Sequence, residues 1–453
     1  MREKTKRIGF LFFIIGMLLL VNPIYSKESK GEPRESEREK EINILKFGLD
    51  DEISSMLDGF MKEKTYLYLD ETFDLFQRTR NVGLREKIIT YFTQAKDNRL
   101  SDYALQVLED PFDTKKTTVT LLFNYAAELD VKDAAVYART LLENDNTEYF
   151  DSALSAIAVL GTPDDALFLA EYLDREDLTT AQQQSVMKAL GKIKAVETWD
   201  ALVAICQDED RNSFVRMYAA EAIGQMGKPE SVPILVELFE STDPNFRVSV
   251  IKGLSNYPND KNSIAVITEA VRDSHYKVRL EAISSIQKMK LTEASSYILY
   301  RAKNDPESSV RYACFTALGE LDSTEGEEYL VDLLKDKKQS DTTKVKACEV
   351  LVKKGNTSSI NAVVALARES LSDDKKKSLR YALGKVFASN ENPLFADICL
   401  EYIKSKDAAT SGTGLDIYAK NKFSSVKSEV VLIADAEKSS ANRTKARKIL
   451  DRE

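Results

Sequence analysis

The feature of this sequence that most restricts its fold is an internal repeat of about 32 residues. Three of its copies read FVRMYAAEAIGQMG (214–227), KVRLEAISSIQKM (277–289) and SVRYACFTALGEL (309–321). Each has an apolar residue and a basic residue, followed by small or apolar residues three, four, six and seven places later. This spacing places the small and apolar residues on one face of a helix.

The basic residue serves as a register mark along the chain. Equivalent positions fall at Arg85, Thr118, Phe150, Gln183, Arg216, Arg247, Arg279, Arg311, Lys344, Lys376, Ala408 and Arg443. A helical hairpin of this length cannot cover its own apolar face, so neighbouring hairpins must stack and share a core. The sequence therefore predicts an all-α fold, an α-solenoid of about twelve helical hairpins.

The pattern V-R-x-x-A-x-x-A-[LI]-G at residues 215–224, with its copies, resembles the HEAT-like repeats of the phycobilin-lyase type. The resemblance extends from about Val82 to the C-terminus. It implies a right-handed superhelix whose concave face is lined by the second helix of each hairpin, in an exported bacterial member. It implies no single activity, because one fold carries many functions.

The N-terminal sequence has the composition of a secretory signal at residues 1–26. Four basic residues precede an apolar run from Ile8 to Val21, which is shorter than the roughly 20 residues of a membrane-spanning helix. We expect cleavage, export to the periplasm and no stable membrane insertion. The alternative is an uncleaved signal that anchors the protein in the inner membrane.

Three segments follow the predicted signal. Residues 27–43 are charged and poor in apolar residues, as in a linker. Residues 44–80 are predicted to form an N-terminal helical cap, in which Ile53, Leu57 and Phe60 follow helical spacing. Residues 81–453 form the predicted solenoid.

The charge of the chain argues against nucleic acid as a partner. The formal net charge is −9 for the full sequence and becomes −12 when residues 1–26, with four basic residues and one acidic residue, are removed. Nucleic-acid binding requires a basic surface that replaces counterions, and no basic block is present beyond the signal.

Recurring acidic and basic residues predict structural ion pairs. Asp210, Asp273 and Asp305 each lie six residues before a register-mark arginine. Such a row could bind an anion, but stacked repeats use the same arrangement to join neighbours, and arginine suits forked bonds to carboxylates. We therefore expect a structural ladder.

The sequence offers little material for catalysis or metal binding. His275 is the only histidine, whereas iron-binding hydroxylases built on HEAT-like repeats carry repeated His-Glu pairs. Cys206, Cys314, Cys348 and Cys399 fall inside predicted helices, where we expect buried free thiols. No nucleophile elbow or phosphate-binding glycine loop occurs. We predict no cofactor, no metal site and no catalytic residue.

One row of residues could form a binding surface. The residue after each register mark is often large and apolar, and lies at the edge of the core face of its helix. This row packs against the next hairpin or forms an exposed stripe along the concave face. The predicted partner-binding residues are Met217, Tyr218, Val248, Leu280, Glu281, Tyr312, Thr316 and Val345.

Two functions follow from these expectations. The first is a non-catalytic scaffold or adaptor in the bacterial cell envelope that binds a protein partner through the concave face. The second is an enzyme of the phycobilin-lyase kind that binds a chromophore or another small ligand, as the resemblance implies. Export, and the absence of a pigment-specific signature, favour the scaffold.

Overall fold

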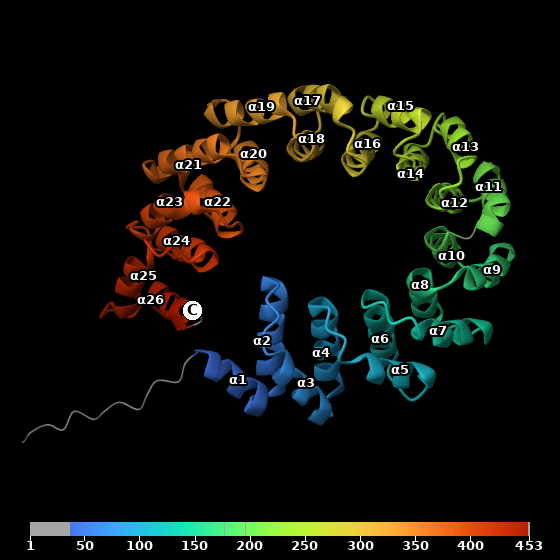
Figure 1. Ribbon diagram of the computed structural model, residues 1–453, viewed down its shortest axis with the longest axis horizontal. Coiled ribbons are helices and arrows are strands. Elements are labelled where there is room, and N and C mark those ends of the chain that lie inside the picture. The colour runs from blue at the N-terminus through green and yellow to red at the C-terminus, as the bar shows by residue number, and fades with distance from the viewer. Residues whose placement is uncertain (1–36, 176, 195, 452–453) are drawn as a thin grey trace, which may run out of the picture. The chain divides into compact units, whose positions relative to one another are not determined.

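A computed structural model describes residues 37–451, except 176 and 195. The predicted signal therefore lies outside the described residues. Every regular element in the described part is a helix, with 26 α-helices and five short 3-10 helices. The α-helices pair into thirteen hairpins, each with a first and a second helix (Figure 1).

The first helices are α1 (Glu37–Phe47), α3 (Leu69–Arg78), α5 (Ser101–Glu109), α7 (Ala134–Glu143), α9 (Pro163–Ala170), α11 (Trp199–Gln207), α13 (Ser231–Leu238), α15 (Lys261–Ala270), α17 (Ser295–Asn304), α19 (Thr324–Lys335), α21 (Thr357–Leu371), α23 (Ala396–Ile403) and α25 (Lys427–Asp435). The second helices are α2 (Asp50–Glu63), α4 (Val82–Ala95), α6 (Lys116–Glu128), α8 (Phe150–Leu160), α10 (Thr180–Ile193), α12 (Ser213–Gln225), α14 (Pro244–Leu254), α16 (Tyr276–Met289), α18 (Ser308–Glu320), α20 (Asp341–Lys354), α22 (Lys377–Ala388), α24 (Ala408–Asn421) and α26 (Ala441–Asp451).

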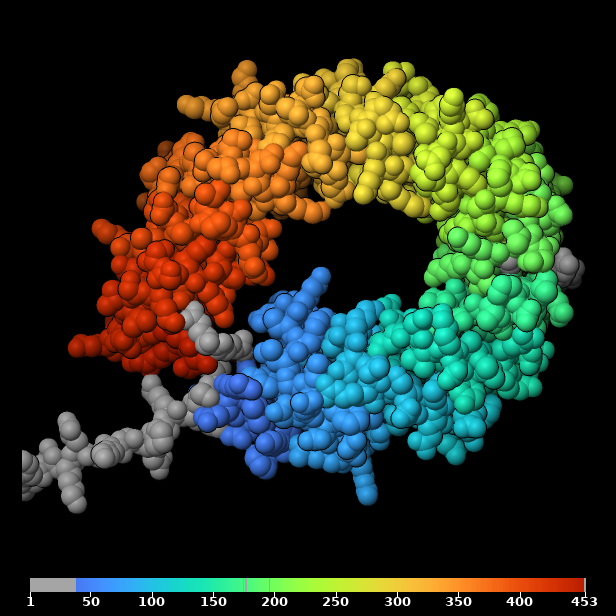
Figure 2. Space-filling view, viewed as in Figure 1, coloured from blue at the N-terminus to red at the C-terminus, as the bar shows by residue number. Residues whose placement is uncertain are grey.

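The hairpins stack in chain order, which confirms the predicted α-solenoid. Each second helix contacts the second helices before and after it, and these helices lie on the inner side of the curved row (Figure 1). The first helices form the outer side. One apolar core runs from Leu45 to Ala446, and the space-filling view shows successive hairpins in unbroken contact (Figure 2).

Small residues let the second helices approach one another closely. A Cβ atom added to Gly224 in α12 would lie 2.3 Å from the Cα atom of Gly253 in α14. These positions can therefore hold only glycine unless the two helices move apart.

The ends of the second helices give the true register of the repeat. At the end of several second helices, the residue eleven places after the mark adopts a left-handed conformation, for example Gly227 (φ 73°) and Lys290 (φ 54°). The same conformation at Asp130 (φ 59°) and Lys422 (φ 51°) places the marks of α6 and α24 at Val119 and Ser411. The predicted marks Thr118 and Ala408 are therefore wrong by one and three residues.

The predicted mark Lys376 is also wrong, by about one helical turn. In α22 the position is held by Arg380, which is 2% exposed and donates from Nη2 to the Ser370 carbonyl at 2.8 Å. The error arises because α21, with 15 residues, is longer than any other first helix. The mark of the next helix therefore falls later in the sequence than the repeat period predicts.

The predicted N-terminal cap, residues 44–80, covers the end of α1, all of α2 and all of α3, and so takes in parts of two hairpins. α1 begins at Glu37, inside the segment 27–43 that the sequence predicts as a linker. α1 contacts α3 and α2 contacts α4, as in the other hairpins, and α2 buries Ile53, Leu57 and Phe60.

The first described helix also contacts the last. α1 contacts α26, with Lys448 Nζ 3.8 Å from Glu41 Oε1. Glu41 also accepts a hydrogen bond from the Tyr68 hydroxyl at 2.9 Å.

Between residues 37 and 451, no helix is both long enough and apolar enough to cross a membrane.

Candidate functional site

The eight predicted partner-binding residues all lie on second helices, from α12 to α20. All are half-buried, and the apolar ones pack against the common core. The row therefore lies at the boundary of the core. The helical period places the residue that follows each register mark at the edge of the core-facing side of its helix.

The structure brings five of these residues together around one hollow. It has a volume of about 450 Å³ and spans α12, α14 and α16. Its walls contain Met217, Tyr218, Val248, Leu280 and Glu281, together with Glu221, Asn245, Ser249, Lys252, Lys277 and Ser284. An apolar floor with a charged border is a typical setting for a bound peptide side chain.

The other three predicted residues lie outside this hollow. Tyr312 in α18 places its hydroxyl 3.3 Å from Thr343 Oγ1, and its ring centroid lies 5.8 Å from that of Phe315. Thr316 Oγ1 donates to the Tyr312 carbonyl at 3.4 Å, and Val345 packs against the core from α20. These residues extend the half-buried row but do not line the hollow.

Two of the four charged groups that line the hollow, Glu221 and Lys252, form an ion pair. Glu221 Oε1 accepts hydrogen bonds from Ser249 Oγ at 2.9 Å and from Lys252 Nζ at 3.2 Å. The ammonium group of Lys188 lies 4.3 Å from the centre of the Tyr218 ring, which fixes that ring at one end of the hollow.

Glu281 is different, because its carboxylate has no hydrogen bond or ion pair with any residue that the structure describes. Burial raises the pKa of Glu281 above its ordinary value, and the nearby Glu221 carboxylate adds to this, while Lys252 and Lys288 oppose it. An unpaired carboxylate beside apolar side chains can accept a cationic donor from outside.

A second pair of hollows, not predicted from the sequence, lies on the inner side of the first hairpins. They have volumes of about 620 and 520 Å³ and share Thr90, Gln94 and Leu121 from α4 and α6. The true mark at Val119 places Leu121 at the position that Tyr218 occupies in α12.

The predicted Asp–Arg ladder is confirmed at two of its three aspartates. Asp273 accepts two hydrogen bonds of 2.8 Å from Arg247, and Asp305 accepts two, of 2.8 and 2.7 Å, from Arg279 of the preceding hairpin. Burial raises the pKa of Asp273, but the bonds from Arg247 and from the His275 amide outweigh it and leave the pKa below its ordinary value.

Asp210 does not join this ladder. It is exposed, and no described arginine contacts its carboxylate. The preceding register mark is Gln183, which has no guanidinium group to donate. The ladder therefore exists only where consecutive hairpins supply both partners.

The histidine and the cysteines have structural roles. His275 Nδ1 accepts a hydrogen bond from the Lys277 amide at 3.3 Å and thereby caps α16. All four cysteines are buried free thiols, as predicted, and burial raises the pKa of Cys206 and of Cys314 to about 12. Such thiols stay protonated and are poor nucleophiles.

Within the described residues, no group of three or more His, Cys, Asp or Glu side chains could hold a metal ion.

Comparison with known proteins agrees with the stacked hairpins. A family model described as "Spirochaete HEAT repeat protein" matches residues 45–449, which is most of the chain. The chain belongs to this family. No curated protein matches this sequence.

Several solved structures resemble this spirochaete HEAT repeat protein. The complex of CpcE and CpcF of phycocyanin lyase from Nostoc has 21% identity and a TM-score of 0.31, covering 50% of this chain and 87% of that one. Human deoxyhypusine hydroxylase has 17% identity and a TM-score of 0.26, covering 58% and 97%. Kap121p has 11% identity and a TM-score of 0.41, covering 92% and 54%. Likenesses this weak carry no argument about activity or partners.

Proposed function

We propose that this protein is a non-catalytic scaffold of the bacterial cell envelope that binds a protein partner through the inner face of the solenoid. The observation that carries the proposal is the hollow over α12, α14 and α16, which gathers five of the eight predicted residues. The N-terminal sequence, with its basic start and apolar run, supports export.

The chemistry of the hollow favours one kind of partner segment. Met217, Val248 and Leu280 offer apolar surface, and the free Glu281 carboxylate offers an acceptor at its border. A segment with a large apolar side chain and a nearby lysine or arginine would match both features. Large apolar anchors supply most of the free energy at protein interfaces, and a charge-assisted hydrogen bond adds orientation.

The test is a double replacement in the half-buried row, Leu280→Ala with Tyr312→Ala, with binding and stability measured together. Partners are recovered from envelope extracts by affinity purification and identified by mass spectrometry. The proposal expects partner recovery to fall strongly while the melting curve changes little. A core role would instead lower stability by roughly 2 to 5 kcal/mol for each truncation.

Matched controls separate these outcomes. Leu432 in α25 is 65% exposed on a first helix, and Leu432→Ala should leave both recovery and stability unchanged. A double variant that is folded and recovers the partner as well as the wild type would contradict binding through the row. A double variant that unfolds early would assign the row to the core.

A further inference from the structure

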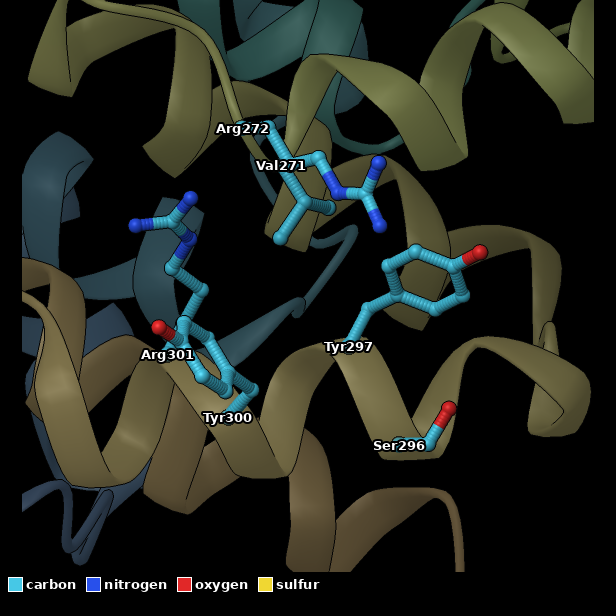
Figure 3. A pocket seen from close by; sticks show the side chains of 6 residues that line it. All are labelled: Val271, Arg272, Ser296, Tyr297, Tyr300 and Arg301. Atoms are coloured by element: carbon cyan, nitrogen blue, oxygen red, sulfur yellow. The ribbon is translucent and has the colours of Figure 1, made fainter.

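The outer side of the solenoid holds a pocket that the proposed function does not use. It has a volume of about 540 Å³ and lies at α15 and α17, both first helices. It is lined by Val271, Arg272, Ser296, Tyr297, Tyr300 and Arg301. Figure 3 shows the two arginines on either side of Val271, each next to a tyrosine.

Arg301 holds a guanidinium group without a hydrogen bond to any described residue. Its side chain is only 21% exposed, and its one acidic neighbour is Asp305, with Nη1 to Oδ2 at 3.8 Å. Both carboxylate oxygens of Asp305 already accept shorter hydrogen bonds from Arg279, at 2.8 and 2.7 Å. Arg301 is therefore left with donors that an external acceptor can use.

Arg272 is held in place with donors to spare. Its side chain lies next to the Tyr297 ring (Figure 3). The guanidinium carbon is 5.0 Å from the centre of that ring, and Nη1 contacts Glu269 Oε2 at 3.3 Å. That contact uses one of its five N–H groups. The aromatic ring restricts the guanidinium, so less conformational entropy is lost when a ligand binds.

The local charge is positive in a protein whose net charge is negative. The arginines here are Arg272, Arg279 and Arg301, whereas the acids that contact them are Glu269 and Asp305. One positive charge is therefore uncompensated, in a chain of formal net charge −9. A local excess of this sign attracts anions, while the acidic surroundings disfavour extended polyanions such as nucleic acid.

The walls of the pocket define the ligand further. Val271 is fully buried, Tyr300 is 60% exposed, and each tyrosine offers ring surface beside one of the guanidinium groups. The two guanidinium groups can each form forked hydrogen bonds, and an apolar and aromatic surface accompanies them. This arrangement fits a peptide segment whose carboxylates alternate with small residues.

We propose that the pocket at α15 and α17 is a binding site for an acidic peptide segment, separate from the inner-face site. Arg301 and Arg272 bind the carboxylates through forked hydrogen bonds. The tyrosine rings pack against the peptide backbone and its aliphatic groups. The protein would then bind partners on both faces, with the outer one selected by negative charge.

The experiment uses the full protein and a fluorescein-labelled ten-residue peptide of alternating Glu and Gly, with fluorescence anisotropy as the readout. A peptide of alternating Gln and Gly is the neutral control. We expect wild type to bind the Glu peptide about a hundredfold more tightly than the Gln peptide, because each of the two arginines contributes a charge-assisted bond worth about tenfold in affinity. Added salt should weaken binding of the Glu peptide.

Variants locate the site. Arg301→Gln and Arg272→Gln should each weaken binding of the Glu peptide about tenfold. Arg368→Gln is the matched control, because Arg368 lies on another first helix and pairs with Glu401 at 2.7 Å. Equal binding of the two peptides by wild type, absence of binding, or equal losses in all three variants would overturn the proposal.

Stability distinguishes a binding residue from a structural one. The Arg301 guanidinium makes no hydrogen bond to any described residue, so Arg301→Gln should leave the unfolding midpoint unchanged or raise it. Arg279→Gln should lower the midpoint, because Arg279 forms the buried fork with Asp305. A loss of stability in Arg301→Gln as large as that in Arg279→Gln would make Arg301 part of the ladder and overturn its role in binding.

Discussion

At the scale of single residues, Gly224 shows how tightly the repeat restricts the second helices. An added Cβ atom would lie 2.3 Å from Gly253 Cα and 2.6 Å from its carbonyl oxygen. We predict that Gly224→Ala lowers the free energy of unfolding by about 1 to 3 kcal/mol, because the clash is with backbone that cannot rotate away. Chemical denaturation measures this directly.

Gly59 in α2 provides the matched control. No atom lies within 4 Å of the position where its Cβ would stand. Gly59→Ala should therefore raise the free energy of unfolding by about 0.5 to 1 kcal/mol through helix propensity alone. If both replacements changed stability in the same direction, close approach of α12 and α14 would not be the cause.

Glu281 should make the stability depend on pH in a recognisable way. Its folded-state pKa is raised by burial, so the folded protein binds its proton more tightly than the unfolded chain. Ionisation therefore lowers stability as the pH rises through this pKa. We predict that Glu281→Gln melts on the order of 1 °C above wild type at about pH 7, and equally below about pH 4. A variant that melts below wild type at neutral pH would show that the carboxylate is stabilising.

At the scale of helices, the sequence predicted the repeat but not every position in it. The V-R-x-x-A pattern fixed the central hairpins, where each mark is an arginine that donates to backbone carbonyls, such as Arg311 to Asp305. The marks Val119 and Ser411 are not basic, and the backbone conformation at the end of each helix reveals them. The pattern also failed to predict the greater length of α21, because the spacing of the earlier repeats gives no sign of an added turn.

The candidate site was predicted to a similar extent. The row of residues that follow the marks predicted five of the residues that line the hollow over α12, α14 and α16. It did so because the row and the hollow lie on the same faces of these helices. The pocket of Arg272 and Arg301 was missed, because its residues lie on α17 and in the turn after α15, outside the second helices that the repeat pattern describes. Only the three-dimensional structure shows that Asp305 is already bound by Arg279, which leaves Arg301 free.

The first hairpin should be required for stability, because each end of a solenoid exposes an apolar face unless another element covers it. Deleting residues 44–64 removes α2 and the end of α1, and exposes the surface of α4 that α2 covers. We predict a lower melting temperature and aggregation, measured by calorimetry and light scattering. Unchanged solubility and melting would mean that this hairpin does not protect the stack.

Two point variants refine this test. Leu57 is fully buried in α2, so Leu57→Ala should lower the free energy of unfolding by about 2 to 5 kcal/mol. Phe47 is 81% exposed, so Phe47→Ala should have little effect. Equal effects of the two would contradict the packing described for this hairpin.

At the scale of the whole molecule, the stack presents two surfaces of different chemistry. The inner face, formed by second helices, carries the half-buried apolar row and the unpaired Glu281. The outer face, formed by first helices, carries the basic pocket at α15 and α17. A scaffold with these two faces could hold two partners at once, and the continuous core between them would keep their positions fixed.

The central claim is that the inner face binds a protein, and site-specific photo-crosslinking in living cells tests it most directly. A benzophenone amino acid replaces Ser284, which is exposed and lines the hollow, and in a second strain replaces Val136, which is 65% exposed on a first helix. We predict that irradiation joins a defined partner to the protein at position 284 and that the same adduct is absent at position 136. The same adduct from both positions, or none from position 284, would contradict the account.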